Sequence, residues 1–69
     1  MKIDIADINR RFNKGDPLTN KELISFIDHM RVLFEHLDIL GPEYRITANH
    51  ILHQLYAAES FARNRKLQF

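Results

Sequence analysis

Two short breaks, Gly15-Asp16-Pro17 and Gly41-Pro42, divide this chain into one short segment and two long ones. Glycine ends helices readily and proline cannot continue one, so each break marks a turn between elements. The segments between the breaks carry apolar residues at spacings of three and four, which is the period of an amphipathic helix. No stretch of any length alternates with the period of a strand, so the sequence predicts an all-α chain.

The three predicted helices cover about 4–14, 20–40 and 43–66 of a single small helical domain, 1–69. The second has the clearest start, because Thr19 and Glu22 match the capping box, in which each side chain accepts a backbone N–H from the other residue. Gly41 is expected to end this helix in a left-handed conformation. A connection this short makes the two long helices antiparallel neighbours. The sequence therefore predicts a helical hairpin with a short N-terminal helix.

Both long helices carry an apolar stripe that we expect to form the core. On the second helix the stripe consists of Leu23, Phe26, Ile27, Met30, Leu33, Phe34, Leu37 and Leu40. On the third it consists of Tyr44, Ala48, Ile51, Leu55, Ala58 and Ala62. The far side of the second helix carries a separate apolar row, Ile24, Val32 and Ile39. One neighbouring helix cannot cover both the stripe and this far row.

Self-association is one way to cover the surplus, because a chain of 69 residues buries a smaller share of its surface than a large domain does. We expect two hairpins to pair into a four-helix bundle dimer, with Phe26, Met30, Leu33 and Leu37 in the seam between the copies. The alternative is a three-helix monomer in which the first helix covers the far row. The two arrangements are compatible.

The apolar residues without a place in the core stripes predict a contact surface for another protein. The residues expected to bind this partner are Ile24, Val32, Ile39 and Phe61. We therefore interpret the chain as a non-enzymatic protein–protein interaction module.

A second hypothesis is a small nucleic-acid-binding or regulatory protein that uses the basic ends of its helices. Arg63, Arg65 and Lys66 crowd the end of the third helix and would contact the nucleic acid. The helix dipole by itself favours cations at a C-terminus, and a net charge of +1 does not indicate a polyanionic partner. Nucleic-acid binding is therefore the weaker of the two hypotheses.

The sequence lacks the residue arrangements of known catalytic centres, so we expect no enzymatic activity and no cofactor. Asp28 and Glu35 are paired acids, but they lie on an outer helix face, where water rather than a pocket would surround them. The four histidines form two pairs, His29 with His36 and His50 with His53. Helical positions turn both pairs away from the core stripes, which indicates exposed side chains. The alternatives are a metal site between two chains, with Asp28 or Glu35, and an interface that responds to pH.

Uninterrupted apolar stretches are far shorter than a membrane span, and we expect no membrane partner. Asp4 and Asp7 stand where an export signal would need an apolar core. The absence of cysteine is compatible with a reducing compartment. Cytoplasmic localisation is therefore expected.

Three strings in the chain resemble small uncharacterised helical proteins encoded in bacteriophage and prophage genomes. They are DPLTNKEL at 16–23, LGPEY at 40–44 and ESFAR at 59–63, and the similarity spans about 18–66. The resemblance implies a small accessory protein that binds a host or phage protein in the cytoplasm of a bacterial cell. It implies no particular catalytic or binding residues.

Overall fold

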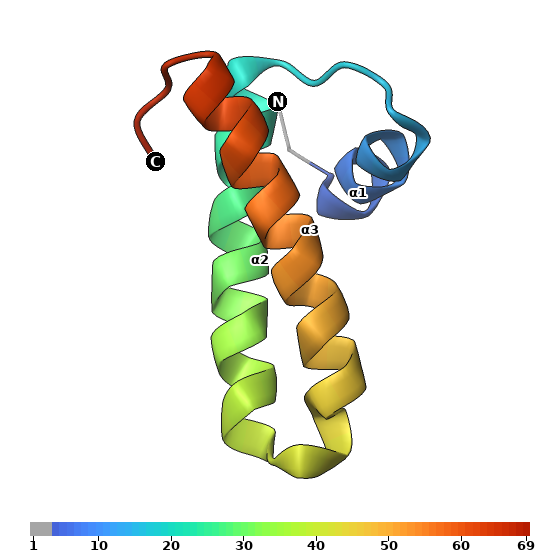
Figure 1. Ribbon diagram of the computed structural model, residues 1–69. Coiled ribbons are helices and arrows are strands. Elements are labelled where there is room, and N and C mark those ends of the chain that lie inside the picture. Colours follow the sequence, from blue (N-terminus) through green and yellow to red (C-terminus); the bar gives the residue numbers. More distant parts are fainter. Residues whose placement is uncertain (1–3) are drawn as a thin grey trace.

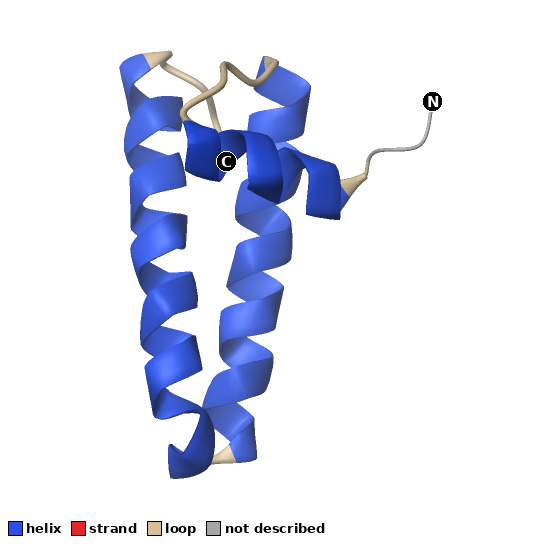
Figure 2. Cartoon of the chain, turned by 90° about the vertical axis from the view of Figure 1, so that its right-hand side faces the viewer, coloured by secondary structure: helices blue, strands red, loops and turns tan. Residues whose placement is uncertain are grey.

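The computed structural model describes residues 4–69 and shows two long helices side by side, with a short helix against one end of the pair (Figure 1). In chain order the elements are α1 (Ile5–Lys14), α2 (Asn20–Leu40), the 3-10 turn η1 (Pro42–Tyr44) and α3 (Arg45–Asn64). No strand occurs within residues 4–69 (Figure 2). The predicted all-α helical hairpin with a short N-terminal helix is confirmed. The first three residues of the predicted domain lie outside the described residues.

Local hydrogen bonds hold both ends of α1. The carboxylate of Asp4 accepts two backbone N–H groups of the first turn. At the other end Gly15 adopts a left-handed conformation with φ of 82°, and the N–H of Asp16 donates to the carbonyl of Arg11 at 2.9 Å. These caps satisfy backbone groups that a helix of only 10 residues would otherwise leave without partners.

The capping box predicted at the start of α2 is present. The hydroxyl of Thr19 accepts the N–H of Glu22 at 3.1 Å, and the carboxylate of Glu22 accepts the N–H of Thr19 at 2.9 Å. The other end of α2 differs from the prediction, because Gly41 has φ of 114° and ψ of −175° instead of the left-handed helical values. Glycine reaches that region because it lacks a Cβ.

Both ends of α3 lie inside the predicted range of 43–66. Pro42 begins a 3-10 turn, so the α-helix itself begins only at Arg45. At the far end Lys66 adopts a left-handed conformation with φ of 59°, and the N–H of Leu67 donates to the carbonyl of Ala62 at 2.9 Å. This arrangement is a Schellman motif, and Leu67 supplies its apolar contact by packing against the core. No glycine marks this end in the sequence.

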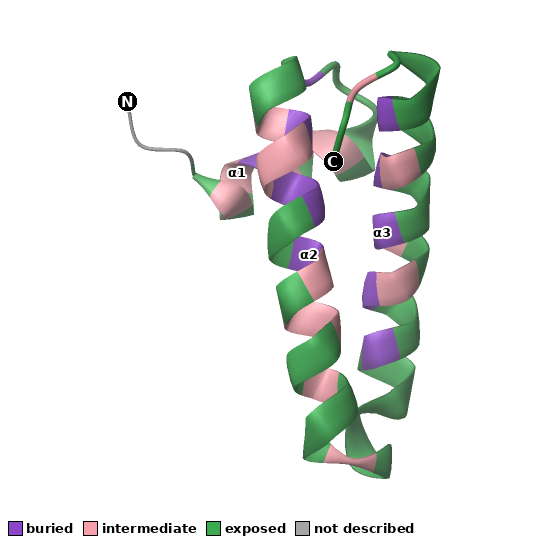
Figure 3. Cartoon of the chain, turned by 90° about the vertical axis from the view of Figure 1, so that its left-hand side faces the viewer, coloured by how far each residue is buried: buried purple, intermediate pink, exposed green. Residues whose placement is uncertain are grey.

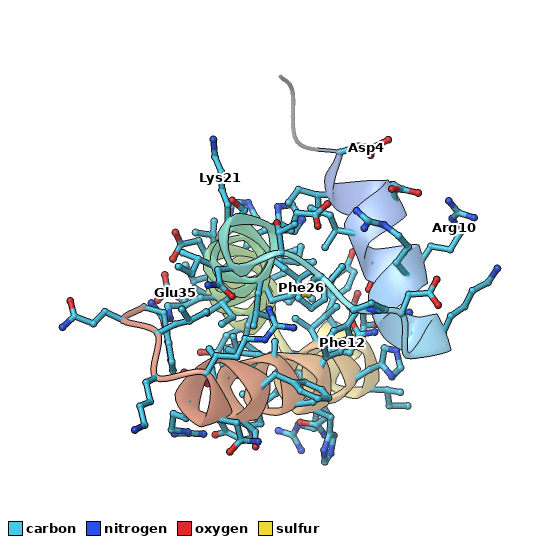
Figure 4. All side chains as sticks on the ribbon, turned by 90° about the horizontal axis from the view of Figure 1, so that it is seen from above. Asp4, Arg10, Phe12, Lys21, Phe26 and Glu35 are labelled. Atoms are coloured by element: carbon cyan, nitrogen blue, oxygen red, sulfur yellow. The ribbon has the colours of Figure 1, made fainter. Side chains whose placement is uncertain are left out.

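The densest part of the core lies where α1 packs against the hairpin, at the end away from the turn (Figure 3). The buried apolar residues are Ile8, Leu18, Leu23, Phe26, Ile27, Met30, Ala48, Ile51, Leu55, Ala58 and Ala62. Phe26 is fully buried, and its ring centroid lies 4.9 Å from that of Phe12 in α1. Viewed along the hairpin, these two rings meet between the helices (Figure 4).

The position of α1 corrects two expectations from the sequence. First, α1 leaves the far row of α2 uncovered: Val32 and Ile39 are exposed, and Ile24 is half-buried. Second, Phe26 and Met30, which were expected in a seam between two copies, lie in the core of the single chain. The physical reason is that α1 packs on the core side of α2, where Phe12 can stack against an aromatic ring.

Candidate interaction surface

The half of α2 nearest the hairpin turn is rich in apolar residues but buries none of them. Among residues 31–40, which we call the turn-end segment, the apolar residues are Val32, Leu33, Phe34, Leu37, Ile39 and Leu40. Leu33, Phe34 and Leu37 are half-buried, whereas the other three are exposed. In Figure 3 the buried positions stop about halfway along α2. The predicted core stripe is therefore covered only in its first half.

The uneven burial follows from the positions of α1 and of the residues after α3, which pack against only one end of the hairpin. Both α1 and the residues that follow α3 lie at the end of the hairpin away from the turn (Figure 1). There α2 is flanked by α3 on one side and by α1 on another, so a wide apolar arc is enclosed. At the turn end α2 packs against α3 and the short turn η1, which together cover only part of its circumference. The turn-end segment thus remains partly open to solvent.

The four residues expected to bind a partner lie in different environments. Val32 and Ile39 are 64% and 83% exposed and lie two helical turns apart on the outer side of α2. Phe61 is also exposed, but its ring packs edge-on against Phe12, with centroids 5.8 Å apart. Ile24 is half-buried. Val32 and Ile39 are therefore the two most exposed of the four residues.

The sequence reasoning missed an exposed apolar residue on α3. Ile46 is 86% exposed, although it lies only two residues after Tyr44 of the predicted stripe. Two residues correspond to a rotation of about 200° around a helix, so its helical position already indicated an outward side chain. Tyr56 of α3 is also exposed. These side chains add to the apolar surface outside the core.

A charged cluster joins α1 to the start of α2. The guanidinium of Arg11 donates to the carboxylates of Glu22 and Asp7. The hydrogen bond from Arg11 and the backbone N–H of Thr19 lower the pKa of Glu22 from an ordinary value near 4.5 to about 2. The hydrogen bond from Arg10, with further help from Arg11, lowers the pKa of Asp7. These groups satisfy one another, so the cluster fastens α1 and offers no free group for acid–base chemistry.

We expect this cluster to make stability depend on pH in acid. Because the pKa of Glu22 is lower in the folded chain than in the unfolded chain, its contribution is present above about pH 4.5 and is lost as the pH falls toward 2. The unfolding temperature of the wild type should fall across that interval, and the Glu22→Gln variant should show a shallower fall. Thermal unfolding followed by circular dichroism measures both. Asp16→Asn, which removes an exposed carboxylate, serves as the control, and identical slopes for wild type and Glu22→Gln would contradict the prediction.

The basic residues at the end of α3 do not all point to an external partner. Arg65 donates to the carbonyl of Leu18 at 2.7 Å and to the side-chain oxygen of Asn20 at 3.2 Å. It therefore ties the end of α3 to the connection between α1 and α2. Arg63 and Lys66 are exposed. Nucleic-acid binding by these three residues stays a prediction, with one of them already engaged inside the chain.

The histidines and acids do not assemble a metal centre in the described part of the chain. Within residues 4–69, no three side chains of His, Cys, Asp or Glu come close enough together to hold a metal ion. All four histidines are exposed.

Among the helices that the structure describes, none is long and apolar enough to cross a membrane.

Comparisons with known proteins add no relative. No family model, no curated protein and no solved structure matches this chain. The resemblance to phage-encoded proteins therefore stays a prediction.

Proposed function

We propose that this chain is a non-enzymatic protein–protein interaction module that binds its partners through the turn end of the hairpin. The turn-end segment supports this proposal, because its apolar side chains are half-buried or exposed throughout. Large apolar side chains gathered on an exposed surface mark contact sites more often than isolated ones do. A phage or host protein is the partner class that the sequence resemblance implies.

The outer side of α2 indicates what kind of protein partner it fits. Val32 and Ile39 form an exposed apolar row, and the acidic residues Asp28 and Glu35 precede them by four residues along the helix. Residues four apart lie on the same face of a helix. A partner surface with an apolar centre and basic residues at its edge would therefore complement this row.

The same surplus of apolar surface supports the finer architecture, in which two hairpins pair into a four-helix bundle. Leu33 and Leu37 remain as seam residues, because both are only half-buried within the single chain. A second hairpin would provide the layer that α1 provides at the other end. Bundles of four helices are a common way for hairpins to enclose a core.

Serine at both Val32 and Ile39 tests the proposed partner surface. Because both side chains are largely exposed, the double variant should keep the free energy of unfolding of the wild type within about 0.5 kcal/mol. Partner capture should be lost, because the apolar centre of the contact is gone. Immobilised wild type and variant are exposed to extract of the native cell, and bound proteins are identified by mass spectrometry.

Tyr56→Ser is the matched control, since it removes an exposed apolar side chain from α3 instead of α2. A protein retained by wild type and Tyr56→Ser but not by the double variant supports the proposal. Equal retention by all three chains would contradict it, and so would unfolding of the double variant, because unfolding would place these residues in the core.

A further inference from the structure

We infer that one face of the turn end is a homodimer interface that opens when its histidines become protonated. The inference rests on the proposed function, because it names a second copy of the chain as an occupant of the turn end. It concerns the face that continues the contact between α1 and the hairpin, and not the outer row of Val32 and Ile39.

The contacts of α1 locate this face on α2. Phe12 of α1 packs on Phe26, and Arg11 of α1 pairs with Glu22. Residues seven apart lie on nearly the same side of a helix, two turns further along. Continuing from Phe26 toward the turn gives Leu33 and Leu40, and continuing from Glu22 gives His29 and His36.

The contacts of α1 also locate this face on α3. Gln54 donates to the side-chain oxygen of Asn13 of α1 at 2.8 Å, so it lies on the side that α1 covers. Four and seven residues nearer the turn are His50 and Thr47, which are both exposed. We call the whole set the histidine face. It consists of His29, Leu33, His36 and Leu40 on α2 and of Thr47 and His50 on α3.

The histidine face carries no formal charge at neutral pH, unlike the opposite side of the hairpin. Its six residues include no Asp, Glu, Lys or Arg. On the opposite side, Arg31 pairs with Glu59 at 3.6 Å, and a hollow near the turn is lined by both Asp38 and Arg45. Depletion of charge is characteristic of the centres of protein interfaces. Two copies of an uncharged face can oppose each other without repulsion, which suits the self-complementary contact of a symmetric dimer.

The amount of exposed surface also fits a second copy. The chain has 5222 Å² of accessible surface. A folded monomer of 8.2 kDa is expected to expose about 4,500 Å², so the excess is about 700 Å². A standard interface buries about 800 Å² on each partner. The excess belongs to the whole chain and not to the histidine face alone, and it is comparable in size with what one copy contributes to a dimer.

Acid should open this dimer because histidine gains a positive charge between about pH 8 and pH 5. Protonation of His29, His36 and His50 would place three positive charges on each copy, and the dimer would bring six of them together at one interface. Charged side chains lose hydration when buried, and like charges repel. Other charged groups lie at the ends of the face: Glu43 in η1 near the turn, and the paired Asp7, Arg11 and Glu22 near α1.

The fold of the single chain should survive the same acidification. The pKa of Glu22 lies near 2, so its ion pair with Arg11 is intact at pH 5. A lower molar mass at pH 5 would then result from dissociation of the dimer and not from unfolding of the chain. Circular dichroism at both pH values checks that the helix content is unchanged.

Light scattering coupled to size exclusion tests the inference at about pH 7.5 and about pH 5. The full chain should have twice the 8.2 kDa mass of one copy at the higher pH and a single mass at the lower pH. The triple variant His29→Gln, His36→Gln, His50→Gln should stay dimeric at both values. The control His53→Gln, which changes a histidine outside the histidine face, should behave as the wild type.

A neighbouring pair of substitutions tests which face is used. Leu40→Glu should give a monomer at pH 7.5, whereas Ile39→Glu, one position away on the outer row, should remain a dimer. A monomeric wild type at pH 7.5, a dimer that persists unchanged at pH 5, or equal effects of the two substitutions would each overturn the inference. A monomeric wild type would also contradict the four-helix bundle dimer. None of these results bears on capture of another protein by Val32 and Ile39, so failure of the inference is separate from failure of the proposed partner surface.

Discussion

Replacing Phe26 by alanine should lower the free energy of unfolding by about 3–5 kcal/mol, which is the usual cost of removing a buried phenylalanine. The side chain is fully buried, and its ring packs against Phe12 of α1. The substitution therefore removes apolar area and leaves a cavity at the point where α1, α2 and α3 meet. A chain of 69 residues has a total stability of roughly 3–10 kcal/mol, so the loss amounts to between about a third and all of that stability.

Urea unfolding followed by circular dichroism measures this loss, and Phe61→Ala provides the matched control. Phe61 also contacts Phe12, but its side chain is 53% exposed. Its replacement should cost about 1 kcal/mol, because less area leaves contact and solvent can fill the space. Equal losses for the two variants would show that α1 is not held through Phe26.

The local signals in the sequence predicted the elements well because their physics is local. The capping box of Thr19 and Glu22 needs only residues three apart, and α2 begins where it predicts. Proline and glycine at the turn act in the same way. The end of α3 is the exception, because Lys66 takes a left-handed conformation that glycine usually supplies. There the contact of Leu67 with the core decides the geometry, and such a contact cannot be derived from neighbouring residues alone.

The position of α1 could not be predicted from its own pattern. Its apolar face fits any apolar groove, and the sequence allowed it to cover either the core side of α2 or the far row. The structure places Phe12 beside Phe26 and Phe61, an arrangement that depends on residues brought together only by the hairpin. With α1 in this position, Phe26 and Met30 are internal, whereas Val32 and Ile39 are exposed.

The open turn end therefore depends on the length of α1 as well as on its position. With 10 residues at a rise of about 1.5 Å each, α1 is about 15 Å long, which is half the length of α2 with its 21 residues. It cannot cover the whole hairpin in any orientation. A sequence of this pattern consequently has apolar surface left over on one half, and the candidate surface follows from that mismatch in length.

The close approach of α3 to its neighbours leads to the second large effect, that of Ala58→Leu. Ala58 is fully buried, so three additional carbon atoms find no space unless the helices move apart. Overpacking of this kind costs about 1–3 kcal/mol, and more where the backbone cannot adjust.

Ala57→Leu is a nearly ideal control, because it makes the same chemical change one residue earlier, at an exposed position of the same helix. Leucine and alanine have similar helix propensities, so the control should change stability by less than about 0.5 kcal/mol. Parallel urea titrations measure the difference. A large loss for Ala57→Leu, or none for Ala58→Leu, would mean that α3 presents a different face to α2 than the one seen in the structure.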